Sequence, residues 1–355
     1  MRILSVDIGV GTQEILLYDE DTSIENCTRF ILPSPTRIFA NRVRKATKMR
    51  KNLVFSGCTM GGGPVSNAIN NHLKHGLRVM MTEESARTIR DDIEQVKSMG
   101  IEIIEENEVE NLKSKGYEHI FTYDFDVSSF LSWIRAYGID FDFDVLAIAV
   151  QDHGFTKGIR DRINRFSILK ELIHKNNRDL RTLAWIDNVP SHLTRMKSLL
   201  DFVKSSISKK ILLLDTGIAA MLGILSDPSC FSDPAILVNV GNGHTICCTI
   251  EDRRILGMFE HHSRFITPKK FDLLVKRLCE GTLSNEDVLN DGGHGALVFE
   301  TVDYEKVRMT SVVGPNRELL RTCNKVSLVS PKGDTMMSGP FGLVYACKYN
   351  LGRET

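Results

Sequence analysis

The sequence predicts an α/β protein made of two related halves, and three observations support this prediction. The chain has 355 residues, which is more than one hydrophobic core usually organises and therefore favours two domains. Between residues 35 and 215, short apolar strands alternate with helical segments, a pattern typical of a mostly parallel sheet. A glycine-rich turn near the N-terminus also recurs around residue 240, which indicates an internal repeat.

The first half begins with β structure and continues with alternating helices and strands. Residues 2–32 hold three β-type runs separated by turn residues, so we expect three antiparallel strands there. Further strands are expected at 52–57, 78–82, 101–104, 144–150, 181–187 and 210–215. Helices are expected at about 36–50, from Pro64 onward, and at 84–98, 127–137, 159–175 and 191–205.

The second half repeats the opening pattern. Residues 235–261 again hold three β-type runs with glycine turns between them. We expect helices at 269–280 and 284–290 to follow, and then a strand at 309–313 that runs into a glycine turn and a helix. A final strand at 325–330 precedes a glycine-containing helix at about 338–348.

The repeat is clearest in two glycine turns. Residues 6–11 (VDIGVG) align with residues 238–243 (VNVGNG) at a constant offset of 232. Both copies follow an apolar strand and lead into another strand. We therefore expect a duplicated domain, with an N-terminal half at residues 1–210 and a C-terminal half at 211–355. Two unrelated β-hairpins with glycine turns are the alternative.

Composition and charge narrow the class of protein. Hydrophobic residues make up 42% and charged residues 25% of the chain, which is ordinary globular composition. Lys plus Arg and Asp plus Glu both number 45, so we expect neither nucleic acid nor membrane as a partner, but a small-molecule substrate. An acidic residue at position 7 interrupts any signal peptide, and we expect a cytoplasmic protein. The oligomeric state stays open.

The glycine turns carry the first functional prediction. A strand that ends in Asp-x-Gly-x-Gly presents backbone N–H groups that can bind phosphate oxygens, while its carboxylate can hold a hydrated Mg²⁺. We predict Asp7 as the metal ligand. The first phosphate loop would comprise Asp7, Gly9, Gly11, Thr12 and Gln13, and the second Asn239, Gly241, Asn242, Gly243, His244 and Thr245. A dinucleotide fingerprint does not fit, because a strand follows each turn where a helix is required.

A third glycine run lies in the first half. Gly61, Gly62 and Gly63 precede Pro64, where a helix is expected to begin. We predict that these glycines form a substrate or anion loop at the helix N-terminus. A plain strand-to-helix turn is an equal alternative.

These residues carry a family resemblance. The segments VDIGVGTQEILLYD and VNVGNGHTICCTI resemble the two phosphate motifs of the actin-like ATPase, sugar kinase and Hsp70 superfamily. SVVGPNRELL resembles its adenosine motif, and GDTMMSGPFGLVYA is similar to its closing helix. The resemblance implies two duplicated ribonuclease-H-like domains with a nucleotide cleft between them, ATP and Mg²⁺ as cofactors, and kinase (phosphotransferase) or ATPase activity. It places Gly314, Pro315, Asn316, Arg317 and Gly339 beside the adenosine.

A second resemblance is closer. The strings CTMGGGP, VQDHGF, DTGIAAMLG, VGNGHT, FEHHS and DGGHGA resemble a prokaryotic family labelled as related to pyruvate formate-lyase activating enzyme. That label implies radical chemistry on an iron–sulfur cluster held by three cysteines. The eight cysteines of this chain form no CxxC pair and no CxxxCxxC cluster. We therefore keep the ATPase-like fold and set aside the chemistry of the label.

The second turn departs from the superfamily pattern. Its first polar residue is Asn239, where an aspartate is usual, and an amide cannot serve as a base or as an anionic metal ligand. A catalytic carboxylate must come from elsewhere. Asp152 and Asp215 both end predicted strands, where α/β sheets place their ligands. We predict Asp152 as the base, and Asp215 is either catalytic or the cap of the following helix.

Histidines support the main alternative function. Five of them lie in polar, glycine-rich strings, and we predict that His153, His261, His262 and His294 contact substrate. Neutral imidazoles beside carboxylates could instead bind a transition metal such as Zn²⁺, Fe or Mn²⁺, or serve only as structural hydrogen-bonding groups. The alternatives are therefore a metal-dependent hydrolase or isomerase, and a nucleotide-binding sensor without catalytic activity. The phosphoryl acceptor stays open.

Overall fold

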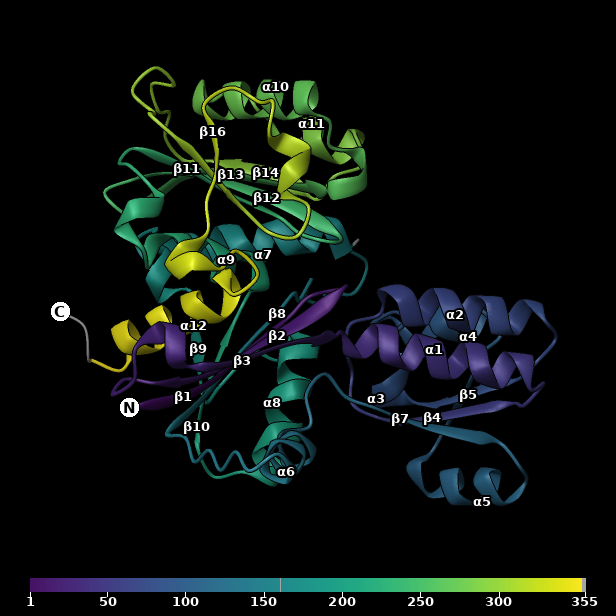
Figure 1. Cartoon of the computed structure of the whole chain (residues 1–355). Coiled ribbons are helices and arrows are strands. Elements are labelled where there is room, and N and C mark those ends of the chain that lie inside the picture. The colour runs from purple at the N-terminus through teal and green to yellow at the C-terminus, as the bar shows by residue number, and fades with distance from the viewer. Residues whose placement is uncertain (160, 353–355) are drawn as a thin grey trace.

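A computed structural model describes residues 1–159 and 161–352 of the chain. Within these residues the protein is a mixed α/β structure with three β-sheets (Figure 1). We call them the first sheet, the second sheet and the inserted sheet. None of the helices in the described ranges is long and apolar enough to cross a membrane.

The first sheet contains the N-terminal strands in the order β3-β2-β1-β8-β10-β9. The three N-terminal strands are antiparallel, as predicted, and β1, β8 and β10 are parallel to one another. β10 begins at Lys210 and so spans the predicted domain boundary between residues 210 and 211. It pairs with β8 and therefore belongs to the first sheet. The strands are β1 (Arg2–Ile8), β2 (Thr12–Asp19), β3 (Thr28–Pro33), β8 (Val145–Val150), β9 (Trp185–Ile186) and β10 (Lys210–Leu214).

The second sheet has the order β14-β13-β12-β11-β15-β16. It too begins with three antiparallel strands, and β14 adds a fourth antiparallel strand beside β13. β15 pairs in parallel with both β11 and β16. β12 has the bounds of β2 shifted by the offset of 232 that relates the two glycine turns. The strands are β11 (Ala235–Val240), β12 (His244–Glu251), β13 (Arg254–His262), β14 (Gly295–Val298), β15 (Thr310–Val313) and β16 (Val326–Leu328).

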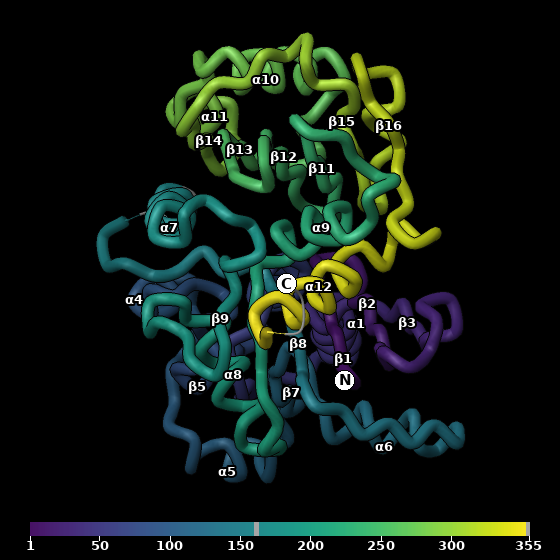
Figure 2. Tube along the Cα trace, turned by 90° about the vertical axis from the view of Figure 1, so that its left-hand side faces the viewer, coloured from purple at the N-terminus to yellow at the C-terminus, as the bar shows by residue number. Residues whose placement is uncertain are grey.

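Three helices lie between the first and second sheets and join them into one core. They are α7 (Asp161–Lys175), α9 (Thr216–Leu225) and α12 (Ser338–Asn350), and Figure 2 shows them between the two sheets. Their buried side chains pack with residues from both sheets, such as Leu16 on β2 and Leu237 on β11. The outer faces are covered by α6 (Val127–Ala136) and α8 (Thr194–Ser206) on the first sheet, and by α10 (Pro268–Cys279) and α11 (Asn285–Asn290) on the second.

The inserted sheet forms a separate layer between β3 and β8 in the chain and lies beside the first sheet (Figure 1). Its four strands are parallel, in the order β6-β5-β4-β7. They are β4 (Leu53–Gly57), β5 (Val79–Thr82), β6 (Glu102–Ile104) and β7 (Glu118–Thr122). The helices of this inserted unit are α1 (Pro35–Lys48), α2 (Gly63–Lys74), α3 (Glu83–Ala86), α4 (Ile93–Ser98) and α5 (Val109–Ser114).

Local structure differs from the sequence prediction in six places. β7, β14 and α5 were not predicted, and the helix expected at 84–98 is divided into α3 and α4. The strand expected at 181–187 is a 3-10 turn followed by β9, and the helix expected after the 314 turn is a 3-10 turn. The short 181–187 segment lies at a sheet edge, where only two residues find a strand partner.

Glycines allow the close crossing of α9 and α12. A Cβ atom built on Gly342 would overlap the carbonyl oxygen of Ala219, and one on Gly223 would overlap the backbone of Ser338. Because backbone atoms cannot swing aside like a side chain, only glycine fits at these two positions. The packing of the two sheets on these helices thus depends on glycine at the crossing.

We predict that Gly342→Ala destabilises the protein. The added methyl group clashes with the α9 backbone, and relieving such overpacking typically costs about 1–3 kcal/mol or more. Urea denaturation monitored by circular dichroism would measure the loss of unfolding free energy. An unchanged unfolding free energy would contradict the described helix crossing.

Candidate functional site

A cavity of about 470 Å³ opens where the carboxyl ends of the first sheet meet the second sheet and the inserted unit. All three glycine segments singled out in the sequence line it. The predicted site residues that line the cavity are Gly9, Gly61, Gly62, Gly63, Asp152, His153, Asn239, Gly241, Asn242, Gly243 and His244. Tertiary structure therefore assembles one site from segments more than 200 residues apart in the chain.

The two glycine turns have matching hydrogen bonds. The Gly9 amide donates to the Thr12 carbonyl at 3.0 Å, and the Gly241 amide donates to the His244 carbonyl at 2.9 Å. Each turn is also held from behind by a serine that follows the third strand of its sheet. Ser34 donates to Gly11, and Ser263 donates to Gly243. The two β-hairpins are thus equivalent in position and in bonding.

The hairpins meet at the cavity. A Cβ atom on Gly11 would overlap the side-chain amide of Asn242, and one on Gly243 would lie 3.3 Å from the Val10 side chain. Among the described residues, the backbone N–H groups of Val10, Gly11, Asn242 and Gly243 donate to no protein acceptor. Backbone donors at such turns are suited to bind an anion.

Asp7 on β1 does not itself line the cavity, but its carboxylate contacts Thr216, which does. Its Oδ1 accepts a hydrogen bond from the Thr216 hydroxyl at 2.6 Å, and its Oδ2 lies against Gly339. Glu14 is its cross-strand neighbour on β2. Burial and the charge of Glu14 raise the pKa of Asp7, and burial raises the pKa of Glu14 to about 7. The role of Asp7 as a magnesium ligand stays a prediction.

The two predicted catalytic carboxylates have different environments. Asp152 lines the cavity, and its two oxygens accept from the backbone amides of Gly154 at 2.7 Å and Met196 at 2.9 Å. Burial raises its pKa despite these bonds. Asp215 caps α9 through the Gly217 amide, as the alternative interpretation proposed, and does not line the cavity.

Arg165 on α7 connects these acidic residues. Its guanidinium donates to Asp215 at 2.8 Å, to Glu260 on β13 at 2.8 Å and to the Asp152 carbonyl at 3.0 Å. Arg165 is only 3% exposed and Glu260 only 1% exposed. Burial alone would raise the pKa of Glu260, but the charge of Arg165 lowers it well below its usual value. The network therefore holds a charged carboxylate in the interior.

A second buried ion pair joins the inserted unit to the first sheet. The Arg195 guanidinium on α8 donates to both oxygens of Asp124 at 2.8 Å and to the carbonyl of Gln151. Asp124 also accepts from the Gly61 amide at 3.3 Å. The pair therefore fixes the glycine run at the wall of the cavity.

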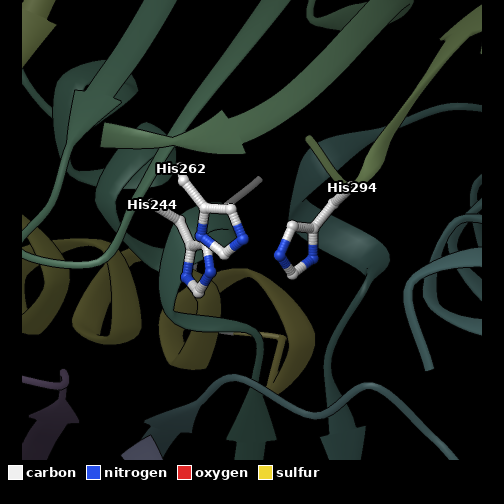
Figure 3. A group of neighbouring side chains, drawn as sticks. All are labelled: His244, His262 and His294. Atoms are coloured by element: carbon white, nitrogen blue, oxygen red, sulfur yellow. The ribbon is translucent and has the colours of Figure 1, made fainter. Parts of the chain in front are cut away.

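Three histidines gather beside the second hairpin. The rings of His244, His262 and His294 point toward one another (Figure 3), and their ligand nitrogens all lie within 4.8 Å of one another. His153 lies next to them, with its ring centroid 5.3 Å from that of His294. Burial lowers the pKa of His294 to about 3, with His244 and Arg165 acting in the same direction, so the ring is neutral.

Several predicted site residues lie outside the cavity lining. His261 is on the opposite face of β13, where its Nε2 lies 3.0 Å from Asp291. The predicted adenosine residues lie behind the second hairpin, where Asn316 donates to the Gly241 carbonyl at 3.0 Å. The predicted residues that do not line the cavity are Asp7, Gly11, Thr12, Gln13, Asp215, Thr245, His261, His262, His294, Gly314, Pro315, Asn316, Arg317 and Gly339.

Sequence reasoning missed the charged residues that organise the site. Arg165 and Arg195 lie in segments whose sequence predicts only ordinary helices. Their acidic partners are up to 95 residues away in the chain, so no local pattern reveals the ion pairs. Glu260 stands next to the predicted histidines, and this was the one available signal. Glu14 gave no signal, because alternation places it among the polar positions of a strand.

Comparisons with known proteins add a family and two distant structures. A family profile described as "Putative pyruvate format-lyase activating enzyme (DUF1786)" matches residues 60–319. A comparison with curated proteins finds no match. The chain is similar at 13% identity to the crystal structure of Ta0583, an archaeal actin homolog, covering 63% of this chain and 75% of that one with a TM-score of 0.28. It is similar at 10% identity to an exopolyphosphatase-like protein, covering 88% and 65% with a TM-score of 0.26.

The cysteines do not form the site that the family description suggests. Of the eight, seven are buried and Cys58 is partly buried, and none is paired. In the described ranges, the histidine cluster is the only group of three or more His, Cys, Asp or Glu residues whose ligand atoms could share a metal.

Replacing Arg165 tests the buried network. We predict that Arg165→Met lowers the free energy of unfolding by about 3–5 kcal/mol, because Glu260 and Asp215 would be left as unpaired buried charges. Arg321→Met is the matched control, since Arg321 pairs with Glu318 at the exposed surface and its loss should change little. Equal effects of the two variants in urea denaturation would contradict the importance of the network.

Replacing Glu14 tests the buried carboxylate pair. The pKa of Glu14 is raised to about 7 in the folded protein, so its charge destabilises the fold above pH 7 and has no effect below about pH 4.5. We predict that Glu14→Gln stabilises the protein by roughly 2–3 kcal/mol at pH 8. The gain should shrink as the pH falls from 7 to 4.5. Glu25→Gln, at an exposed position, is the control, and a gain independent of pH would contradict the assignment.

Proposed function

The chain belongs to the family described as putative pyruvate format-lyase activating enzyme, whose profile matches most of its length, and we propose that it binds ATP in the cavity between its two glycine hairpins. The proposed activity is phosphotransfer or ATP hydrolysis, on a duplicated, ribonuclease-H-like scaffold of the actin-like ATPase type. The observation that carries the proposal is that two equivalent hairpins meet at one cavity, with backbone N–H groups in their turns that donate to no acceptor among the described residues.

The turn amides are the proposed phosphate ligands. Val10 on one side, and Asn242 and Gly243 on the other, line the cavity and offer donors, and the Gly11 amide lies next to Val10 in the same turn. An extended polyanion can accept hydrogen bonds from both turns at once. Such binding would hold the two sheets together, because each hairpin belongs to a different sheet.

The donor set fits phosphate oxygens better than a directly bound Mg²⁺. Mg²⁺ prefers carboxylate oxygens and water, but Asp7 directs its carboxylate to Thr216 and α12. We propose that Mg²⁺ enters with the nucleotide and keeps several waters, with Asp7 as the nearest carboxylate beneath the first turn. The ion would neutralise charge on the phosphates when bound.

Asp152 is the proposed orienting carboxylate. It lines the cavity, and the amides of Gly154 and Met196 hold its side chain in one orientation. Two backbone hydrogen bonds leave further lone pairs on its oxygens to accept from an incoming hydroxyl or water. Phosphoryl transfer needs mainly such positioning, so a carboxylate held rigidly at the cavity wall suits the reaction.

The adenosine would lie beyond the second hairpin. Asn316 donates to the carbonyls of Val240, through its backbone amide, and Gly241, through its side chain. This places the predicted adenosine residues next to the phosphate turn but outside the cavity. We propose that the base and ribose bind on this side while the phosphates reach into the cavity.

Calorimetric titration with ATP and Mg²⁺ tests the proposal. We predict binding by the wild-type protein and at least about tenfold weaker binding by Gly243→Val, because the larger side chain would fill the space between the hairpins beside Val10. Inorganic tripolyphosphate should compete with ATP, since the turns recognise phosphate.

Gly76→Asn is the matched control. Gly76 lies in a turn with a φ of +73°, which asparagine tolerates, and an added Cβ there meets nothing within 4 Å. This variant should bind ATP as the wild type does. Absence of ATP binding by the wild type, or equal binding by a folded Gly243→Val, would reject the nucleotide cleft.

A further inference from the structure

We propose that His244, His262 and His294 form a binding site for one divalent transition-metal ion at the wall of the cavity. Their candidate ligand nitrogens lie within 4.8 Å of one another, and the ring centroids are 4.5–4.9 Å apart (Figure 3). Zinc–imidazole bonds are about 2.0–2.1 Å long, which places nitrogens of one tetrahedral ion about 3.3 Å apart. Ring movements of about an ångström would therefore bring the three nitrogens onto one ion.

The backbone presents all three histidines from neighbouring strands. His244 begins β12 and His262 ends β13, and they are direct partners in the antiparallel register. His294 comes just before β14, and its amide donates to the Glu260 carbonyl at 2.9 Å. Strands position ligands more rigidly than loops do, so the site is largely formed before an ion arrives.

His294 gives the independent sign of a missing ligand. It is 3% exposed, and neither of its ring nitrogens makes a hydrogen bond within the described part of the chain. Buried polar groups in proteins are nearly always satisfied, so an unsatisfied imidazole that faces two others indicates an absent partner. A metal ion supplies that partner for one nitrogen.

A carboxylate supports the cluster from behind. Glu260 is on the same face of β13 as His262, and its Oε1 lies 3.5 Å from Nδ1 of His294. The Glu260 carboxylate forms an ion pair with Arg165 and accepts a hydrogen bond from the Gln151 side chain at 2.6 Å. Carboxylates in this position orient the histidine ligands of metal sites.

The ligand set indicates the class of ion. Imidazole nitrogen suits Zn²⁺, Co²⁺ and Fe²⁺ far better than Mg²⁺ or Ca²⁺, which prefer oxygen. Three protein ligands leave a fourth position open, as in catalytic rather than structural zinc sites. Because His244 and Glu260 line the cavity, the ion would stand at its wall.

Cobalt binding to the metal-free full-length protein tests the site without any nucleotide, so the result is independent of the proposed function. We expect one equivalent of Co²⁺ per chain with the visible absorption of a tetrahedral ion, displaced by Zn²⁺ but not by Mg²⁺. His294→Ala and His262→Ala should each weaken binding at least about a hundredfold, more than the loss of a supporting residue usually costs.

His174→Ala is the matched control, because His174 is an exposed histidine on α7 and should leave binding unchanged. Circular dichroism checks that each variant is folded. His262 is only partly buried, so its variant keeps the test valid if His294→Ala does not fold. Failure of the wild type to bind Co²⁺ or Zn²⁺ stoichiometrically would overturn the proposal, as would undiminished binding by a folded His262→Ala.

Discussion

The Arg165 guanidinium is the cation on which the arrangement around the cavity depends. It contacts the Asp152 carbonyl after β8, the Asp215 carboxylate after β10 and Glu260 on β13 of the second sheet. Two buried acids from two sheets therefore share one positive charge. Without it, either sheet would have to expose its carboxylate to water or protonate it, because burial of an unpaired charge is very costly. Arg165 therefore links the first and second sheets through buried ion pairs.

The glycines of α9 and α12 also help to join the two sheets, because they let the two helices cross closely. The sheets can share a core only if the helices between them cross closely, and Gly223 and Gly342 allow that approach. Two kinds of contact therefore join the sheets. The ion pairs of Arg165 connect them at the cavity, and the close crossing of α9 and α12 packs them together in the core. This arrangement gives the two hairpins a fixed separation, which a preorganised anion site needs.

The two proposed binding sites, one for phosphate and one for a metal ion, are adjacent at the cavity. Turn amides on both hairpins suit phosphate oxygens, and the histidine cluster lies next to the second hairpin and suits a transition metal. His244 belongs to both, because it begins β12 immediately after the turn and faces His262. An ion held there would add positive charge beside the proposed phosphate position. Asn239 also lines the cavity, and as an amide it adds no negative charge there.

Most of the strands, most of the helices, the repeated hairpins and the glycine turns could be predicted from the sequence, because each depends on neighbours within a few residues. Five strands of each sheet have equivalent orders, β3-β2-β1-β8-β10 in the first and β13-β12-β11-β15-β16 in the second. Polar strings also indicated His153, His244, His262 and His294 as site residues. Which of these histidines come together depends on strand pairing, which puts His262 opposite His244 and leaves His261 on the other face of β13. Only the tertiary structure decided the partners of Arg165, Arg195 and Glu14, since ion pairs between distant segments depend on packing and leave no periodic signal in the chain.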